Sequence, residues 1–171
     1  MLWKIENKHI ITISGKPGSG KSSTADKVAE LLGYTSYSSG DMVRNLLARE
    51  HMTLAEYNEK ASSDHALDEK IDVFLRNLRT KNDIVIDSRL GFYWIPESFK
   101  VYLDLDIQIA TVRIFKDAVS NNGRTKGGEL ADSLSVVAHQ VKTRMDTEQQ
   151  RFKDLYSVDP YNSEHFDLVI D

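Results

Sequence analysis

The sequence predicts an α/β fold in which helices cover both faces of a five-stranded parallel sheet. Two observations support this prediction. Short apolar runs, each long enough for one buried strand, alternate along the chain with longer stretches of helical periodicity. A glycine-rich loop, from Ser14 to Ser23, stands between the first apolar run and the first helical stretch, a position where α/β proteins bind ligands.

The first 38 residues predict a strand, a helix and a second strand. Residues 9–13 are apolar and β-branched and lead to a glycine, as a buried strand does. Residues 21–32 have helical periodicity, and Gly33 follows at the position of a helix-ending glycine. Residues 34–38 are expected to form a short strand. The apolar residues at helical spacing are Val28, Leu31 and Leu32.

Helices are expected in the next forty or so residues. Residues 41–50 have a helical pattern, and Thr53 and Glu56 match a capping box, so another helix is expected to begin at Leu54. Residues 65–79 carry one apolar stripe and predict a further helix. The stripe consists of Leu67, Ile71, Phe74, Leu75 and Leu78.

The second half of the chain repeats the alternation. Apolar runs predict strands at residues 83–87, 99–104 and 166–170. Helical patterns at residues 107–119 and 133–156 lie between the last two. A closing helix would be expected after the final strand, where the chain stops.

The composition narrows the class of protein. The chain has 171 residues, of which 40% are hydrophobic and 28% are charged, the balance of one soluble globular domain. We therefore expect a single domain over residues 1–171, working as a monomer. A formal net charge of -4 argues against general binding of nucleic acid, which relies on many phosphate contacts.

The sequence also limits the cellular location and the kinds of metal site that we expect. The absence of cysteine excludes disulfides and cysteine-based zinc sites. The N-terminus has no signal-peptide pattern, and no run approaches the roughly 18 apolar residues of a membrane helix. The five histidines have no metal-ligand spacing. We expect a cytoplasmic protein with no membrane partner.

The glycine-rich loop carries the most specific motif. Gly15-Lys-Pro-Gly-Ser-Gly-Lys-Ser22 matches G-x-x-x-x-G-K-[ST] between a predicted strand and a predicted helix, the context that distinguishes a phosphate-binding loop from a chance glycine turn. Its amides and the helix N-terminus favour an anion, Lys21 is expected to reach the β- and γ-phosphates, and Ser22 to bind Mg²⁺. The expected ATP contacts are Gly15, Pro17, Gly18, Ser19, Gly20, Lys21, Ser22 and Ser23.

The segment Tyr37-Ser-Ser-Gly-Asp-Met-Val-Arg44 follows the second predicted strand. It resembles the acceptor-binding segment of nucleoside monophosphate kinases, and the resemblance assigns Ser39 and Arg44 to the acceptor's phosphate. An arginine in the first helical turn can fork onto a phosphate. The alternative is a capping serine or aspartate beside an exposed arginine.

A more specific resemblance covers nearly the whole chain. The sequence is similar to archaeal-type cytidylate kinases in several segments. They are Ser39-Gly-Asp-Met-Val-Arg44, Met52-Thr-Leu-Ala-Glu-Tyr-Asn58, the acidic residues Asp64, Asp68 and Asp72, Val85-Ile-Asp-Ser-Arg-Leu-Gly91, Thr143 to Tyr156, and Asp167-Leu-Val-Ile-Asp171.

This resemblance implies a three-layer P-loop kinase fold of the nucleoside monophosphate kinase type. It implies a helical acceptor-binding insert at about residues 41–81 and a short lid at about residues 120–132. It also implies transfer of the ATP γ-phosphoryl group to CMP or dCMP, with Mg²⁺.

Two arginines on the last long helix are candidates for phosphoryl stabilisation. Arg144 and Arg151 are seven residues apart, two turns on one helix face, and can bridge donor and acceptor phosphates. Glu148 lies between them and can orient an arginine or touch the acceptor. The alternative is a solvated polar face with an i,i+4 pair worth about 0.3–0.5 kcal/mol.

Three further residues have more than one interpretation. Arg89 follows a central strand and is expected to point into the ligand crevice and hold the acceptor. Asp87 is either in the second shell of Mg²⁺ or orders the phosphate-binding loop. By resemblance, Asp68 is assigned to recognition of the base, whereas by pattern alone it could belong to an exposed helix face.

One segment departs from the family pattern. The lid of these kinases is usually rich in arginine, whereas residues 121–128 offer only Arg124 and Lys126, with Arg113 earlier in the chain. The alternatives are therefore a P-loop kinase of another small acceptor, such as AMP, UMP or a non-nucleotide metabolite, and an ATP-binding regulatory protein without kinase activity.

Overall fold

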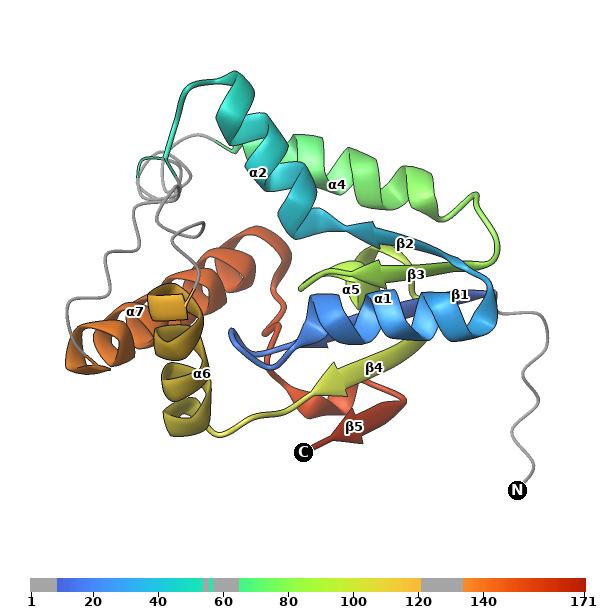
Figure 1. Ribbon diagram of the computed structural model, residues 1–171. Helices are drawn as coiled ribbons and strands as arrows, with labels where there is room; N and C mark the ends of the chain where they lie inside the picture. The colour runs from blue at the N-terminus through green and yellow to red at the C-terminus, as the bar shows by residue number, and fades with distance from the viewer. Residues whose placement is uncertain (1–8, 54–55, 57–64, 121–133) are drawn as a thin grey trace.

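The structure, a computed structural model, describes residues 9–53, 56, 65–120 and 134–171, without the side chains of Leu67 and Val119. Strands and helices alternate along these residues (Figure 1). The strands are β1 (Ile10–Gly15), β2 (Thr35–Ser38), β3 (Ile84–Asp87), β4 (Phe99–Leu103) and β5 (Leu168–Ile170). The helices are α1 (Lys21–Leu32), α2 (Ser39–Arg49), α4 (Ala66–Leu78), α5 (Gly91–Trp94), α6 (Ile107–Ser120) and α7 (Leu134–Tyr156).

The five strands found in the described residues form one parallel sheet in the order β2-β3-β1-β4-β5. Ile13 of β1 lies opposite Asp87 of β3 and Val101 of β4 in the register. The prediction of a five-stranded parallel sheet is confirmed. Because all strands run the same way, the segments that follow β1, β2, β3 and β4 meet at one edge, where open α/β sheets bind ligands.

Helices cover both faces of the sheet because the strand side chains alternate between them. On β3, Ile84 and Ile86 enter a core shared with α4, α5 and α7, whereas Val85 enters a core against α1. The first core contains Ile10, Leu75, Leu78, Ile84, Ile86, Leu90, Phe92, Ile95 and Phe152. The second contains Ile13, Ala25, Ala29, Val85, Val101 and Leu103.

Helix α1 has the predicted bounds but a different buried face. Gly33 ends it with φ 69°, the left-handed conformation that glycine adopts most easily. The residues pressed against the sheet are Ala25 and Ala29, whereas Leu31 and Leu32 are 73% and 51% exposed. Two alanines let the helix pack close to the strands, so the larger residues at its end lie beyond the edge of that contact.

The four-residue helix α5 was not expected from the sequence. Its aromatic rings pack against the acceptor-side helix α4 and against α7. The indole of Trp94 donates from Nε1 to Asp72 of α4 at 2.9 Å, and Tyr156 of α7 donates to the same carboxylate at 2.7 Å. Asp72 is 8% exposed, and burial raises its pKa. Asp72, one of the acidic residues that the chain shares with the family pattern, therefore lies on a buried face of α4.

The capping box is confirmed. The carboxylate of Glu56 accepts from the backbone N–H of Thr53 at 2.7 Å, and the Thr53 hydroxyl accepts from the N–H of Glu56 at 3.2 Å. The predicted helix start at Leu54, the acidic residue Asp64 and the proposed lid at residues 121–132 lie outside the described residues.

None of the helices in the described residues is both long enough and apolar enough to cross a membrane.

A buried hydroxyl pair between Thr12 and Ser98 generates a prediction about stability. The two side-chain oxygens are 2.9 Å apart, and both residues are 0% exposed. Ser98→Ala leaves the Thr12 hydroxyl buried without this partner, so we expect a loss of about 1–3 kcal/mol in the free energy of unfolding. Urea unfolding measures the loss. In the double variant Thr12→Val, Ser98→Ala neither hydroxyl remains, and we expect it to lose less than the sum of the single variants; strict additivity would contradict the pair.

Candidate active site

The phosphate-binding loop connects β1 to α1 and is shaped by glycine. Gly15 has φ 151°, and a Cβ there would lie 2.3 Å from the carbonyl oxygen of Leu103, so only glycine fits. Gly20 starts α1 in the left-handed conformation, and no side chain in the described residues caps the helix there. The first amides of α1 are therefore available to an anion, which is the geometry that a phosphate requires.

The other residues of the phosphate-binding loop differ in their burial and in their contacts. Pro17 is buried, Ser23 is exposed, and the Ser19 hydroxyl is buried without a hydrogen-bond partner among the described residues. Lys16 pairs with Asp104 at the end of β4 at 2.5 Å, and this hydrogen bond lowers the pKa of Asp104. The loop, which follows β1 in the chain, is thus also held to the end of the neighbouring strand β4.

Lys21 lies over the loop with its Nζ donating to the carbonyl of Lys16 at 2.9 Å. Burial and, after it, the nearby positive charge of Arg89 lower its pKa to about 7, against the opposing attraction of Asp87. A lysine whose ammonium form is destabilised in this way is suited to receive an anion.

Asp87, at the end of β3, joins the loop to the ends of β2 and β3. The Ser22 hydroxyl donates to its carboxylate at 2.5 Å, and Ser38 approaches the same oxygen at 3.5 Å. The Ser39 hydroxyl donates to the backbone carbonyl of Asp87 at 3.3 Å. The Ser22 hydroxyl and the Asp87 carboxylate are oxygen ligands of the kind that Mg²⁺ takes together with phosphates and water.

No group of three or more histidine, aspartate or glutamate side chains in the described residues could hold a metal ion.

The carboxylate of Glu148 gathers two arginines. Its Oε1 accepts from Nε of Arg144 at 3.1 Å, and its Oε2 accepts from Nε of Arg89 and from the hydroxyl of Tyr161, the latter at 2.8 Å. Burial opposes ionisation, but Arg89 and Arg144 outweigh it and lower the pKa of Glu148 to about 2. Glu148 is therefore an anion that orients both arginines, one of the two roles considered from the sequence.

Arg151 faces a different carboxylate from Arg144, although both are on α7. Its guanidinium lies 3.9 Å from Asp68 of α4, and the two side chains are only 12% and 6% exposed. The interpretation of Asp68 as part of an exposed helix face is wrong. Arg144 thus pairs with a carboxylate of its own helix, close enough to Lys21 to lower the pKa of the lysine, whereas Arg151 lies beside a carboxylate of α4.

Arg44 lies apart from this cluster. Its side chain is 67% exposed and pairs with Asp41 of the same helix at 2.5 Å. Ser38, and not Ser39, caps α2 by accepting from the N–H of Asp41 at 3.2 Å. These contacts match the alternative in which a serine caps the helix beside an exposed arginine.

Comparisons with known proteins agree with this geometry. A sequence model of the cytidylate kinase-like family matches residues 10–171. The chain belongs to the cytidylate kinase-like family. It is 31% identical to the cytidylate kinase of Haloquadratum walsbyi over 166 residues, covering 94% of this chain and 79% of that protein. It is 34% identical to the cytidylate kinase of Sulfurisphaera tokodaii over 164 residues, covering 94% and 84%.

Solved structures of two shikimate kinases share the fold of this member of the cytidylate kinase-like family. The shikimate kinase of Bacteroides thetaiotaomicron aligns with a TM-score of 0.60 at 10% identity, over 95% of this chain and 85% of that one. The shikimate kinase of Acinetobacter baumannii, in complex with shikimate, aligns with a TM-score of 0.55 at 19% identity, over 95% and 82%. At these identities the likeness shows the fold alone.

Sequence reasoning missed Tyr161, whose hydroxyl is the third hydrogen-bond donor to the Glu148 carboxylate. The Asp159-Pro160 turn directly after α7 was the available signal, because a turn there can bring the following residues back toward the helix. The burial of Asp72 by Trp94 and Tyr156 had no local signal, since the three residues are far apart in the chain.

The lowered pKa of Lys21 predicts how stability depends on pH. The unfolded lysine keeps its proton up to its ordinary pKa of 10.5, whereas the folded one loses it at about 7. Between these values the unfolded state binds more protons, so the free energy of unfolding should rise with pH, by at most about 1.4 kcal/mol per pH unit. Lys21→Met should lack this rise. Urea unfolding of both proteins between about pH 7 and pH 10 isolates the effect, because other groups titrate alike in both; a constant difference between the two would contradict it.

Proposed function

We propose that this chain is a nucleoside monophosphate kinase that transfers the γ-phosphoryl group of ATP to CMP or dCMP, with Mg²⁺ as the metal. The observation that carries the proposal is the convergence of Lys21, Arg89 and Arg144 beside an uncapped phosphate-binding loop. The names of the relatives supply the acceptor, since they are cytidylate kinases.

On the donor side, the loop from Gly15 to Ser23 would hold the phosphates of ATP through its backbone amides. Lys21 would regain its proton as an anion approaches, because a nearby negative charge favours the ammonium form. Ser22 would contribute its hydroxyl to Mg²⁺, and Asp87, already bonded to that hydroxyl, would support the ion from the second shell. Bound Mg²⁺ would supply neutralisation of phosphate charge.

On the acceptor side, Ser39, Arg44 and Arg89 would hold the monophosphate, and an insert at about residues 41–81 would form the rest of the acceptor site. Arg44 is exposed and its surface pair with Asp41 contributes little, so its side chain can turn toward a bound phosphate at small cost. Asp68 on α4 would accept from the amino group of the base.

The reaction needs positioning and charge neutralisation more than acid–base chemistry. Lys21, Arg144 and Arg151 would stabilise the transferring phosphoryl group. We assign no general base, because the acceptor phosphate is already a nucleophilic anion. A lid at about residues 120–132 would exclude water and protect ATP from hydrolysis.

The proposal predicts ADP release from Mg-ATP that depends on CMP or dCMP. Lys21→Ala should lower kcat by about a hundredfold or more, because it removes a cation that acts on the transition state. Arg44→Ala should instead raise the KM for CMP about tenfold and leave the KM for ATP little changed. A coupled ADP-release assay with CMP, dCMP, UMP, AMP and GMP measures both effects.

Lys27→Ala is the matched control for Arg44→Ala. Lys27 is also an exposed helical cation in an i,i+3 pair, with Glu30 at 2.7 Å, and it comes after the residues of α1 that are assigned to ATP. Release with AMP or UMP in place of CMP would keep the kinase and overturn the acceptor. A folded protein that binds ATP but responds to none of these acceptors would favour a regulatory protein or an acceptor outside the nucleotides.

A further inference from the structure

The carboxylate of Glu148 accepts hydrogen bonds from two arginines and from a third, uncharged donor. Arg144 bonds Oε1, while Arg89 and the Tyr161 hydroxyl share Oε2. The Glu148 side chain is 12% exposed, so its unused lone pairs have little access to water. A carboxylate bonded only to two guanidiniums could still rotate about its last torsion, whereas a fixed third donor defines its plane.

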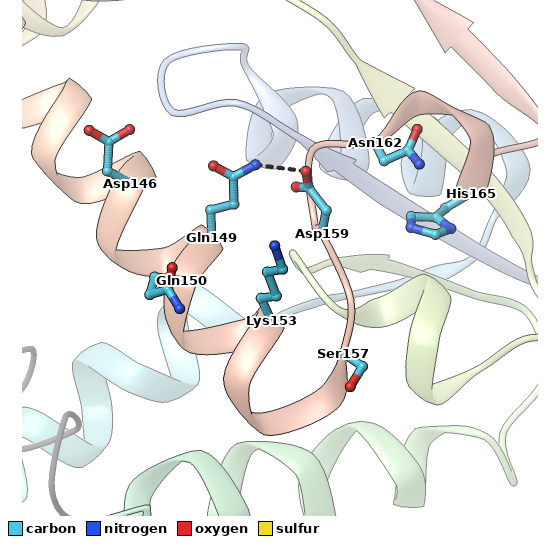
Figure 2. A pocket seen from close by; sticks show the side chains of 8 residues that line it. All are labelled: Asp146, Gln149, Gln150, Lys153, Ser157, Asp159, Asn162 and His165. Carbon is cyan, nitrogen blue, oxygen red and sulfur yellow. Dashed lines mark hydrogen bonds between the residues drawn. The ribbon is translucent and has the colours of Figure 1, made fainter.

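Tyr161 is itself held by a turn anchored on α7. The carboxylate of Asp159 accepts from the N–H of Tyr161 at 2.9 Å and from Nε2 of Gln149 at 2.7 Å. Figure 2 shows Gln149 reaching from α7 across to Asp159 on the segment that follows the helix. The intervening Pro160 is fully buried. Gln149 directly follows Glu148, so one helical turn fixes both ends of this chain of hydrogen bonds.

A polar cavity of about 600 Å³ lies beside the turn, and Gln149, Asp159 and His165 are among the residues that line it (Figure 2). Apolar packing therefore does not support the turn from this side. The buried Pro160 holds the turn on its other side, and the hydrogen bonds of Asp159 add a specific constraint on the backbone of Tyr161.

We propose that Tyr161 is a positioning residue, which acts through Glu148 to fix Arg89 and Arg144 for phosphoryl transfer. Its effect on turnover rests on the proposed function, whereas its effect on the arginines does not. A phenol suits this role because it donates a hydrogen bond without adding charge, so the carboxylate's charge is left to the arginines. Burial and the charge of Glu148 raise the pKa of Tyr161, which keeps its proton in place.

Tyr161→Phe tests this role, with Tyr156→Phe as the matched control. Each variant removes one tyrosine hydroxyl that donates to a carboxylate. The two hydrogen bonds have similar lengths, 2.8 Å from Tyr161 to Glu148 and 2.7 Å from Tyr156 to Asp72. We expect Tyr161→Phe to lower kcat about tenfold with the KM for ATP little changed, because misplaced arginines act mainly on the transition state. Tyr156→Phe should lower the unfolding temperature to a similar extent and keep kcat.

A second measurement does not depend on turnover. In ¹⁵N-labelled protein, the Nε–Hε signals of Arg89 and Arg144 report how firmly Glu148 holds them. We expect these signals to shift and exchange faster with water in Tyr161→Phe, and to match the wild type in Tyr156→Phe. Unchanged signals in Tyr161→Phe, or equal losses of kcat in both variants, would overturn the proposal. If the wild-type protein phosphorylates none of the acceptors, the proposed function fails, and the arginine signals alone decide the role of Tyr161.

Discussion

The site is built around cations that repel one another when no anion is present. Lys21, Arg89 and Arg144 lie close enough for the arginines to help lower the pKa of the lysine to about 7. Glu148 and Asp87 compensate part of this charge. Glu148 does so by accepting from both arginines, and Asp87 by its attraction for the lysine. The ligand-free protein therefore carries an electrostatic strain that a bound polyanion would relieve, which links the cost of folding the site to its preference for phosphate.

The parallel sheet is what brings these charges together. β1 delivers the glycine loop, β3 delivers Asp87 and Arg89, and α7 crosses the same edge with Arg144 and Glu148. Helix α4 is joined to this assembly through the buried Asp72, which bonds Trp94 of α5 and Tyr156 of α7. The acceptor-side helix is thus attached to the same long helix that carries the arginines, by a hydrogen bond as well as by packing.

Local features of the fold could be predicted, and features that depend on distant partners could not. The loop motif, the bounds of α1 and the central strands depend on periodicity, glycine and β-branched residues within a few positions of one another. The four-residue helix α5 has no such periodicity, and its aromatic rings became interpretable only with Asp72 in place. The helical spacing of Arg144 and Arg151 suggested that they bridge donor and acceptor phosphates. Their carboxylate partners come from α7 and α4, and the partner on α4 is one that no pattern within α7 reveals.

The whole chain is acidic whereas its site is rich in cations, and this difference in charge limits the ligands that can bind there. The chain has a formal net charge of -4, so its long-range field repels large polyanions. The cations are concentrated at one edge of the sheet, where Arg89 and Arg151 are only 15% and 12% exposed. Buried side chains can be contacted only by a group that enters the site, and their charges are screened less by salt than surface charges. Such a site attracts an anion small enough to enter it and gives little attraction to an extended phosphate backbone, as a kinase of small phosphate-bearing molecules requires.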